Sequence, residues 1–166
     1  VLNPVPGDGP EDLAESLAEG LRALLTSLSR LVPDADLIVQ LDEPSLPAIL
    51  NGGLPTASGF GRIRPVDAQE ALPLLQTVLT AAGERATVLH CCAAHPPLPL
   101  LRRTGAGALS VDTSLLTPRG WEGLAVAAED GVTLYAGCVA TTPEARVDPV
   151  AVADRVDQHL VAVHRV

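Results

Sequence analysis

Several residue types are missing or scarce in this 166-residue chain, and each scarcity narrows what the protein can do. Methionine and lysine are absent, and only three residues are aromatic. All 11 basic residues are therefore arginines, and with 20 acidic residues the net charge is −9. An acidic chain without a basic stripe argues against nucleic acid and against an anionic membrane surface as partners. The unbroken apolar runs span only a handful of residues, too few for a transmembrane helix.

Cysteine is also scarce, and the N-terminus lacks the usual signals. Three cysteines, two of them adjacent, do not make a disulfide framework, which indicates a reducing compartment such as the cytoplasm. No secretory signal pattern is found at the start of the chain. Because the chain opens on Val1 without an initiator methionine, we interpret it as a fragment of a longer protein.

The residues that are present predict a folded domain. Hydrophobic residues make up 47% of the chain and charged residues 19%, which is too apolar for a disordered segment. The length suits one domain. We therefore expect residues 1–166 to belong to a single folded domain.

Helical and strand patterns alternate along the chain. A helix is expected from Pro10 to about residue 33, with one leucine face, and further helices from Asp67 to near Gly83, over 118–129, and from Asp148 to His164. Residues 45–65 are expected to form a loop. Pro73 either kinks the second helix or shows that it begins later than Asp67. Short apolar runs predict strands at about 36–42, 87–92, 107–112 and 132–139. The leucine face consists of Leu13, Leu17, Leu21, Leu24, Leu28 and Leu31.

This alternation predicts an α/β fold with a parallel sheet. An open doubly wound sheet and a (β/α)8 TIM-type barrel both fit, and four strand–helix units would supply about half of a barrel. No Gly-x-Gly-x-x-Gly follows the first strand, which disfavours a dinucleotide-binding sheet. In both folds, sites lie at the carboxyl ends of the strands.

Chemistry-bearing residues stand at those carboxyl ends. His90 and Cys92 are two apart on a strand, so their side chains are expected on the same side, while Cys91 faces away. An imidazole and a thiolate suit Zn²⁺, with Asp112 at the end of the next strand as a third ligand. The alternative is a buried cysteine beside a hydrogen-bonded histidine.

Two acids close the first strand. Asp42 and Glu43 are followed by Pro44, and such a pair can hold an ammonium group or act as a general base. The alternative is a solvated turn in which Asp caps the next segment.

The order of these motifs resembles the C-terminal barrel of cobalamin-independent methionine synthase. The motifs are Asp42-Glu43-Pro44, the pair His90 and Cys92, and the strand Leu109-Ser110-Val111-Asp112, and the resemblance covers roughly residues 34–143. It implies that residues 1–166 are the C-terminal portion of a single TIM-barrel catalytic domain. It also implies a zinc-dependent methyltransferase in methionine biosynthesis, a part of amino-acid biosynthesis. The methyl group would pass from a donor, of the 5-methyltetrahydrofolate type, to the thiol of homocysteine.

The resemblance also implies roles for individual residues. His90, Cys92 and Asp112 would bind zinc, with Asp112 standing where the family usually has Glu. Asp42, with Glu43 beside it, would bind the amino group of homocysteine. Cys138 stands where many members carry the catalytic His of a Tyr-Asp-x-His motif. The family's fourth ligand, a Cys, would lie past Val166, so we expect residues 1–166 alone to hold zinc weakly.

Other functions remain open at this point. One alternative is another enzyme of the same superfamily, a corrinoid-linked methyltransferase or a uroporphyrinogen-decarboxylase-like protein. Another is a barrel that binds a thiol or metal without turnover, which Ala136 and Cys138 favour. The expected partners are small-molecule substrates, together with the remaining half of the barrel or a second chain.

Overall fold

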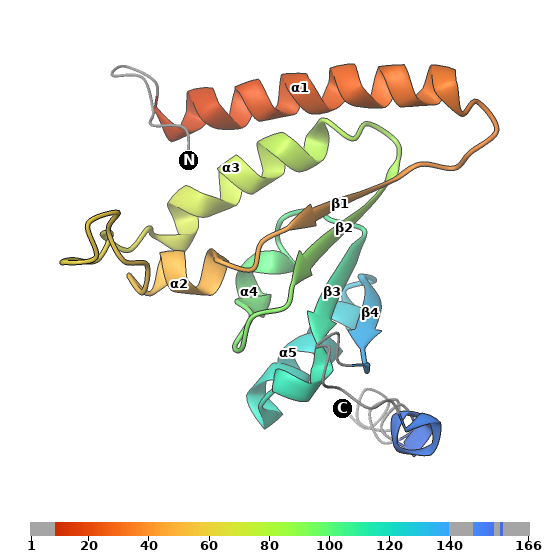
Figure 1. Ribbon diagram of the computed structural model, residues 1–166. Helices are drawn as coiled ribbons and strands as arrows, with labels where there is room; N and C mark the ends of the chain where they lie inside the picture. The colour runs from red at the N-terminus through yellow and green to blue at the C-terminus, as the bar shows by residue number, and fades with distance from the viewer. Residues whose placement is uncertain (1–8, 140–147, 155–156, 158–166) are drawn as a thin grey trace.

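The computed structural model describes residues 9–139, 148–154 and 157. Within these residues, helices alternate with the strands of one sheet (Figure 1). The helices are α1 (Pro10–Leu31), α2 (Leu46–Leu50), α3 (Ala68–Thr80), α4 (Leu98–Leu101), the single 3-10 turn η1 (Thr113–Leu115) and α5 (Pro118–Glu129). The strands are β1 (Ile38–Asp42), β2 (Ala86–Cys91), β3 (Ala108–Asp112) and β4 (Thr133–Gly137).

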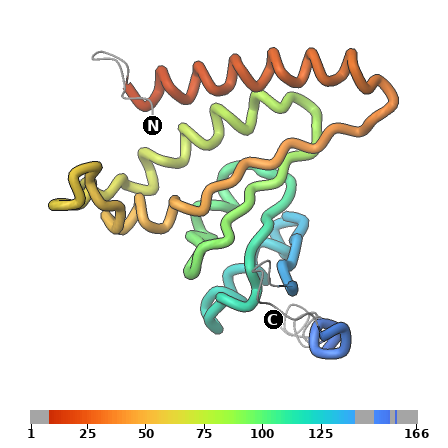
Figure 2. The backbone as a smooth tube through the Cα atoms, viewed as in Figure 1, coloured from red at the N-terminus to blue at the C-terminus, as the bar shows by residue number. Residues whose placement is uncertain are grey.

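The four strands form a parallel sheet in the order β1-β2-β3-β4. Each strand therefore pairs with its neighbour in the sequence, and the path of the chain through the sheet can be followed in Figure 2. All carboxyl ends lie at one edge because the strands are parallel. The prediction of four parallel strands with alternating helices is confirmed. A sheet in this order is compatible with half of a barrel.

The main core lies on one face of the sheet. Leu89, Cys91 and Leu109 point from the central strands into a cluster with side chains of α3, α4 and α5. Leu89 and Leu109 are fully buried. At about 25 cal/mol per Å² of apolar surface removed from water, this layer is the principal favourable contribution to folding. We call this face of the sheet the helix-covered face.

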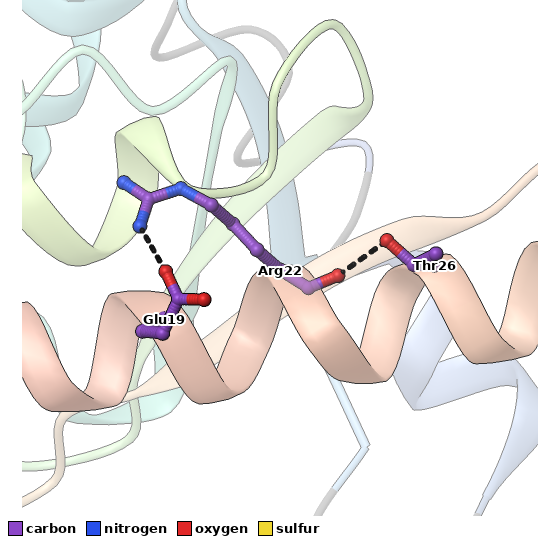
Figure 3. Close-up of polar contacts among 3 residues, drawn as sticks. All are labelled: Glu19, Arg22 and Thr26. Atoms are coloured by element: carbon purple, nitrogen blue, oxygen red, sulfur yellow. Dashed lines mark hydrogen bonds and ion pairs between the residues drawn. The ribbon is translucent and has the colours of Figure 1, made fainter.

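Helix α1 packs on α3 (Figure 1). Pro10 occupies the first helical turn, where its missing N–H costs nothing, and the Asp12 carboxylate accepts a hydrogen bond from the Gly9 N–H at 2.9 Å. On the solvent side, Arg22 pairs with Glu19 at 3.3 Å, and its carbonyl accepts a 2.8 Å bond from the Thr26 hydroxyl (Figure 3).

The expected leucine face of α1 is rotated relative to the contact that forms. Ala14, Ala18 and Leu25 are buried, whereas Leu13, Leu17, Leu24 and Leu31 remain exposed. The small alanines let α1 approach α3 closely, which a row of leucines would prevent. Of the six leucines of the expected face, Leu21 and Leu28 are half-buried and the other four are exposed, so the leucine spacing identified the helix but not the side that packs on α3.

Three further details settle or correct the sequence-based boundaries. The segment expected to be a loop, 45–65, contains α2, in which Leu46 is buried. The Asp67 carboxylate caps α3 by accepting the Gln69 N–H at 2.7 Å, so the helix begins where the cap predicts and includes Pro73. Residues 149–154 and 157 are helical, as expected for the last helix, and the rest of 148–164 lies outside the described residues.

No helix within the described ranges is long and apolar enough to cross a membrane.

Candidate functional site

A row of polar side chains crosses the second face of the sheet near its carboxyl edge. The strand register pairs Asp42 with His90, His90 with Ser110, and Ser110 with Tyr135. Directly paired residues in a sheet point to the same side, so the four side chains share one face, opposite Leu89 and Leu109. We call this the polar row. Asp42 and Tyr135 are exposed at its ends, and His90 and Ser110 are half-buried at its centre.

The two central members of the polar row contact each other. Nδ1 of His90 lies 2.9 Å from Oγ of Ser110. Because Nδ1 is occupied by this hydrogen bond, Nε2 is the ring nitrogen left for a ligand. His90 therefore has the environment of a metal-binding or proton-transferring histidine, and equally that of a histidine held in place by a hydroxyl.

The adjacent cysteines have opposite environments. Cys91 is the last residue of β2 and is fully buried on the helix-covered face. Burial raises the pKa of its thiol; a hydrogen bond from the Ala93 backbone lowers it, and the nearby Cys92 and Glu43 raise it again. Cys92 lies just past the end of β2 and is exposed. Of the two thiols, only that of Cys92 is accessible to a ligand from solvent.

The two acids after β1 also differ. Oδ1 of Asp42 accepts a hydrogen bond from Nε2 of Gln40 at 2.7 Å. Glu43 is half-buried, and its N–H donates to the His90 carbonyl oxygen at 2.7 Å, which extends the β1–β2 ladder by one bond. Burial raises the pKa of the Glu43 carboxyl, and the Asp42 carboxylate raises it further. The two neighbouring acids therefore differ: Glu43 is half-buried with a raised pKa, and Asp42 is exposed.

Asp112 and Cys138 lie at the ends of the next two strands. Asp112 is the last residue of β3, two residues after Ser110, and its partner in the register is Gly137 of β4. Its Oδ1 accepts hydrogen bonds from the Ser114 N–H at 2.9 Å and the Ser114 hydroxyl at 2.6 Å. The Cys138 thiol donates to the Ala136 carbonyl oxygen at 3.3 Å. Asp112 therefore caps η1 with one oxygen and has a second oxygen for another partner.

All six residues singled out from the sequence lie at the same edge of the sheet: Asp42 and Asp112 end strands, Glu43, Cys92 and Cys138 follow strands, and His90 is the last residue but one of β2. Asp42 and His90 are direct neighbours across β1 and β2. Across the parts of the chain that the structure describes, no three His, Cys, Asp or Glu residues form a group that would hold a metal ion.

Sequence reasoning missed Ser110. The signal was present in the strand Leu109-Ser110-Val111-Asp112, where alternation places Ser110 and Asp112 on one face and the two apolar residues on the other. Gln40, which is bonded to Asp42, could have been found by the same alternation in β1.

A separate cavity of about 330 Å³ lies where the loops after β2 and β3 meet α4 and α5. Its lining is mainly apolar and includes Leu98, Leu116 and Val126, with His95, Arg119 and Glu122 as polar members. None of the six candidate residues contributes to it.

Comparisons of the chain with protein-family models, with curated proteins and with solved structures found no match.

Proposed function

We propose that this chain supplies half of a (β/α)8 barrel that catalyses zinc-dependent methyl transfer to a thiol, that of homocysteine. The observation that carries the proposal is the place and state of His90. It stands at the carboxyl edge of a sequentially ordered parallel sheet, with Asp42 beside it and Nδ1 already occupied by Ser110. Enzymes with barrels of this kind build their sites at that edge.

The chemistry of the donor set fits zinc. Nε2 of His90, the exposed thiol of Cys92 and the second carboxylate oxygen of Asp112 are nitrogen, sulfur and oxygen ligands of the types that zinc accepts. When bound, zinc would lower the pKa of a substrate thiol so that a thiolate is present at neutral pH. In the described structure these donors share an edge without forming a closed group, so binding would require them to draw together.

Residues of the first strand would bind the rest of the substrate. The Asp42 carboxylate is exposed at one end of the polar row and can pair with the ammonium group of an amino acid. Because His90 is its register partner, this pairing would place the substrate thiol towards His90. Glu43, the next residue along the chain, would support this pairing from its half-buried position beside Asp42. Cys138, at the end of β4, would stand on the side of the methyl donor, of the 5-methyltetrahydrofolate type.

The edges of the sheet support a partner for this half-barrel. β1 and β4 each have one pairing strand, so both present unpaired backbone groups among the described residues. The remaining half of the barrel, or a second chain, would satisfy them. We expect the cytoplasm as the compartment, because the three cysteines are free.

Zinc titration by calorimetry tests the metal site. The 166-residue chain should bind zinc weakly, and Cys92→Ala should abolish that binding. Cys91→Ala is the matched control, since its thiol is buried on the opposite face and should leave zinc binding unchanged. Zinc binding that survives both Cys92→Ala and His90→Gln would refute the proposed site.

Homocysteine addition tests the substrate. With cobalt in place of zinc, homocysteine should add a thiolate-to-cobalt absorption band, and Asp42→Asn should raise the homocysteine concentration needed to produce it. Asp36→Asn removes an exposed acid before β1 and should have no effect. Turnover with homocysteine and a methyl donor, measured on the protein joined to its other half, separates an enzyme from a barrel that only binds a thiol. Ala136 and Cys138, in place of the family's Asp and His, favour the second outcome.

A further inference from the structure

We propose that Ser110 is the positioning residue that sets the tautomer of His90, by accepting the Nδ1–H and leaving the lone pair of Nε2 for a ligand. The purpose of this tautomer rests on the proposed function, because a bound metal needs the lone pair of Nε2. The tautomer itself can be measured in the metal-free protein, so the two ideas can fail separately.

The contact between the two side chains is built into the sheet. His90 and Ser110 are register partners on β2 and β3, the two central strands, and each of these strands is paired on both sides. Their backbones are therefore fixed relative to each other, and the 2.9 Å distance between Nδ1 and Oγ needs no loop to maintain it. Both side chains are half-buried, which limits competition from water.

On the other side of His90, no hydrogen bond among the described residues holds a proton on Nε2. Asp42 is the register partner on that side, and a carboxylate bonded to Nε2–H would select the wrong tautomer for metal binding. Oδ1 of Asp42 is instead engaged by Nε2 of Gln40 at 2.7 Å. Among the described residues, no hydrogen bond or ion pair joins Asp42 to His90.

This arrangement has the form that metal-binding histidines generally need. A ligating histidine usually donates its second ring N–H to a fixed acceptor, which orients the ring, and loss of that acceptor typically costs 10–100-fold in metal affinity. Serine has the right size here, because its oxygen reaches the ring across one strand spacing. The polar row therefore contains a ligand and its orienting partner side by side.

Nitrogen-15 NMR of the metal-free chain measures the tautomer directly, with His90 assigned from the His90→Gln spectrum. At a pH where the imidazole is neutral, the wild type should carry its proton mainly on Nδ1. Ser110→Val removes the hydroxyl and should shift the proton to Nε2, the tautomer that imidazole side chains prefer in water. Ser110→Thr has nearly the same shape as the valine variant but keeps a hydroxyl, and should restore the wild-type tautomer. A wild-type proton on Nε2, or a valine variant with an unchanged tautomer, would overturn the inference.

Cobalt and zinc affinities give the second measurement. Ser110→Val should bind roughly 10–100-fold more weakly than the wild type, and Ser110→Thr should recover most of the loss. Thr133→Val makes the same hydroxyl-to-methyl change at an exposed position on β4, in the next row of the same face, and should leave affinity unchanged. An equal loss in Thr133→Val and Ser110→Val would show a general effect of the sheet face and overturn the role of Ser110.

The two measurements separate the proposals. If metal binding is the same in His90→Gln as in the wild type, the proposed function fails, and the tautomer spectra still decide the role of Ser110. If His90→Gln abolishes metal binding while Ser110→Val does not weaken it, the proposed function stands and the positioning role is wrong.

Discussion

His90 and Cys91 are consecutive in the chain but belong to different parts of the molecule. His90 lies in the polar row beside Ser110, and Cys91 lies in the apolar cluster beneath α3 and α4. The cause is the two-residue period of a strand, which sends neighbours to opposite faces. The strand ends at Cys91, so this alternation of faces does not extend to Cys92, which is exposed to solvent. The chemical behaviour of each residue here follows from the face on which it lies.

The three thiols should react with iodoacetamide in the order of their exposure. Cys92 is exposed. Cys138 is half-buried and its thiol donates a hydrogen bond to the Ala136 carbonyl oxygen, and Cys91 is fully buried with a raised pKa. The thiolate is the reactive form, so burial and a raised pKa both slow Cys91. Peptide mapping by mass spectrometry should find Cys92 modified first and Cys91 only when denaturant is added. Equal rates for Cys91 and Cys92 in the native protein would contradict the packing of β2.

Glu43 should make the stability of the protein depend on pH. Burial, and then the Asp42 carboxylate, raise its pKa in the folded state, so the folded protein binds the proton more tightly than the unfolded chain. The stability due to this group is fully present below the unfolded pKa and is lost as pH rises through the raised folded pKa. Glu43→Gln stays neutral and should therefore gain stability relative to wild type between acid and neutral pH.

Urea unfolding at both ends of that range measures the effect. The control is Glu84→Gln, which replaces an exposed acid in the turn after α3. Its free energy of unfolding relative to wild type should change little between the two pH values. A pH profile of Glu43→Gln that runs parallel to the wild type would show that Glu43 is solvated rather than buried.

The helices begin where their capping residues are, and pack where their small residues allow. Asp67 caps α3, and the Thr117 hydroxyl caps α5 by accepting the Gly120 N–H at 3.3 Å, with Pro118 in the first turn. These local signals are readable in the sequence. Which side of a helix faces its neighbour depends on both surfaces, and in α1 the alanines decide it.

Two adjacent leucines of α1 should therefore differ in their effect on stability. Leu25 is 5% exposed and packs with Val39 of β1 and with Ala82, just after α3, whereas Leu24 is 54% exposed. Leu25→Ala should cost about 2–5 kcal/mol, because it removes buried methyl groups and leaves a cavity. Leu24→Ala should change the free energy of unfolding by no more than about 0.5 kcal/mol. Chemical denaturation of the two variants makes the comparison, and similar losses would show that α1 is rotated from the position described.

At the scale of the whole molecule, the described residues form a sheet with a protected centre and two edge strands that have no second pairing strand among those residues. β2 and β3 are each paired on both sides and contribute the fully buried Leu89, Cys91 and Leu109. β4 has exposed residues along most of its length, and β1 begins with the exposed Ile38. Exposed edge strands usually carry charges or are covered by another element. β4 carries no charged residue, which is consistent with a partner at this edge.

Hydrogen exchange should rank the strands by this arrangement. Amides of β2 and β3 open only with the core and should exchange slowest, while those of β4 should exchange much faster because few buried contacts hold it. Mass spectrometry of peptides covering each strand provides the measurement. If β4 is as protected as β3 in the isolated chain, then its outer edge is already covered.

The sequence by itself determined the elements and their order. Strand-length apolar runs, helix caps and prolines predicted four parallel strands, with α1 before the first strand and α3 and α5 between later ones, because these signals act within a few residues. It also placed Asp42, His90, Cys92 and Asp112 at one edge, since parallel strands bring their carboxyl ends together.

Only the tertiary structure decided which of these side chains meet. The register joined His90 to Ser110, the packing of α1 buried Leu25 against Val39 and Ala82 and left Leu24 exposed, and α2 formed inside an expected loop around the buried Leu46. Each of these depends on a surface contributed by a distant part of the chain. Local propensity does not contain that information, because contacts between elements are chosen by the fit of two surfaces and not by the pattern of one.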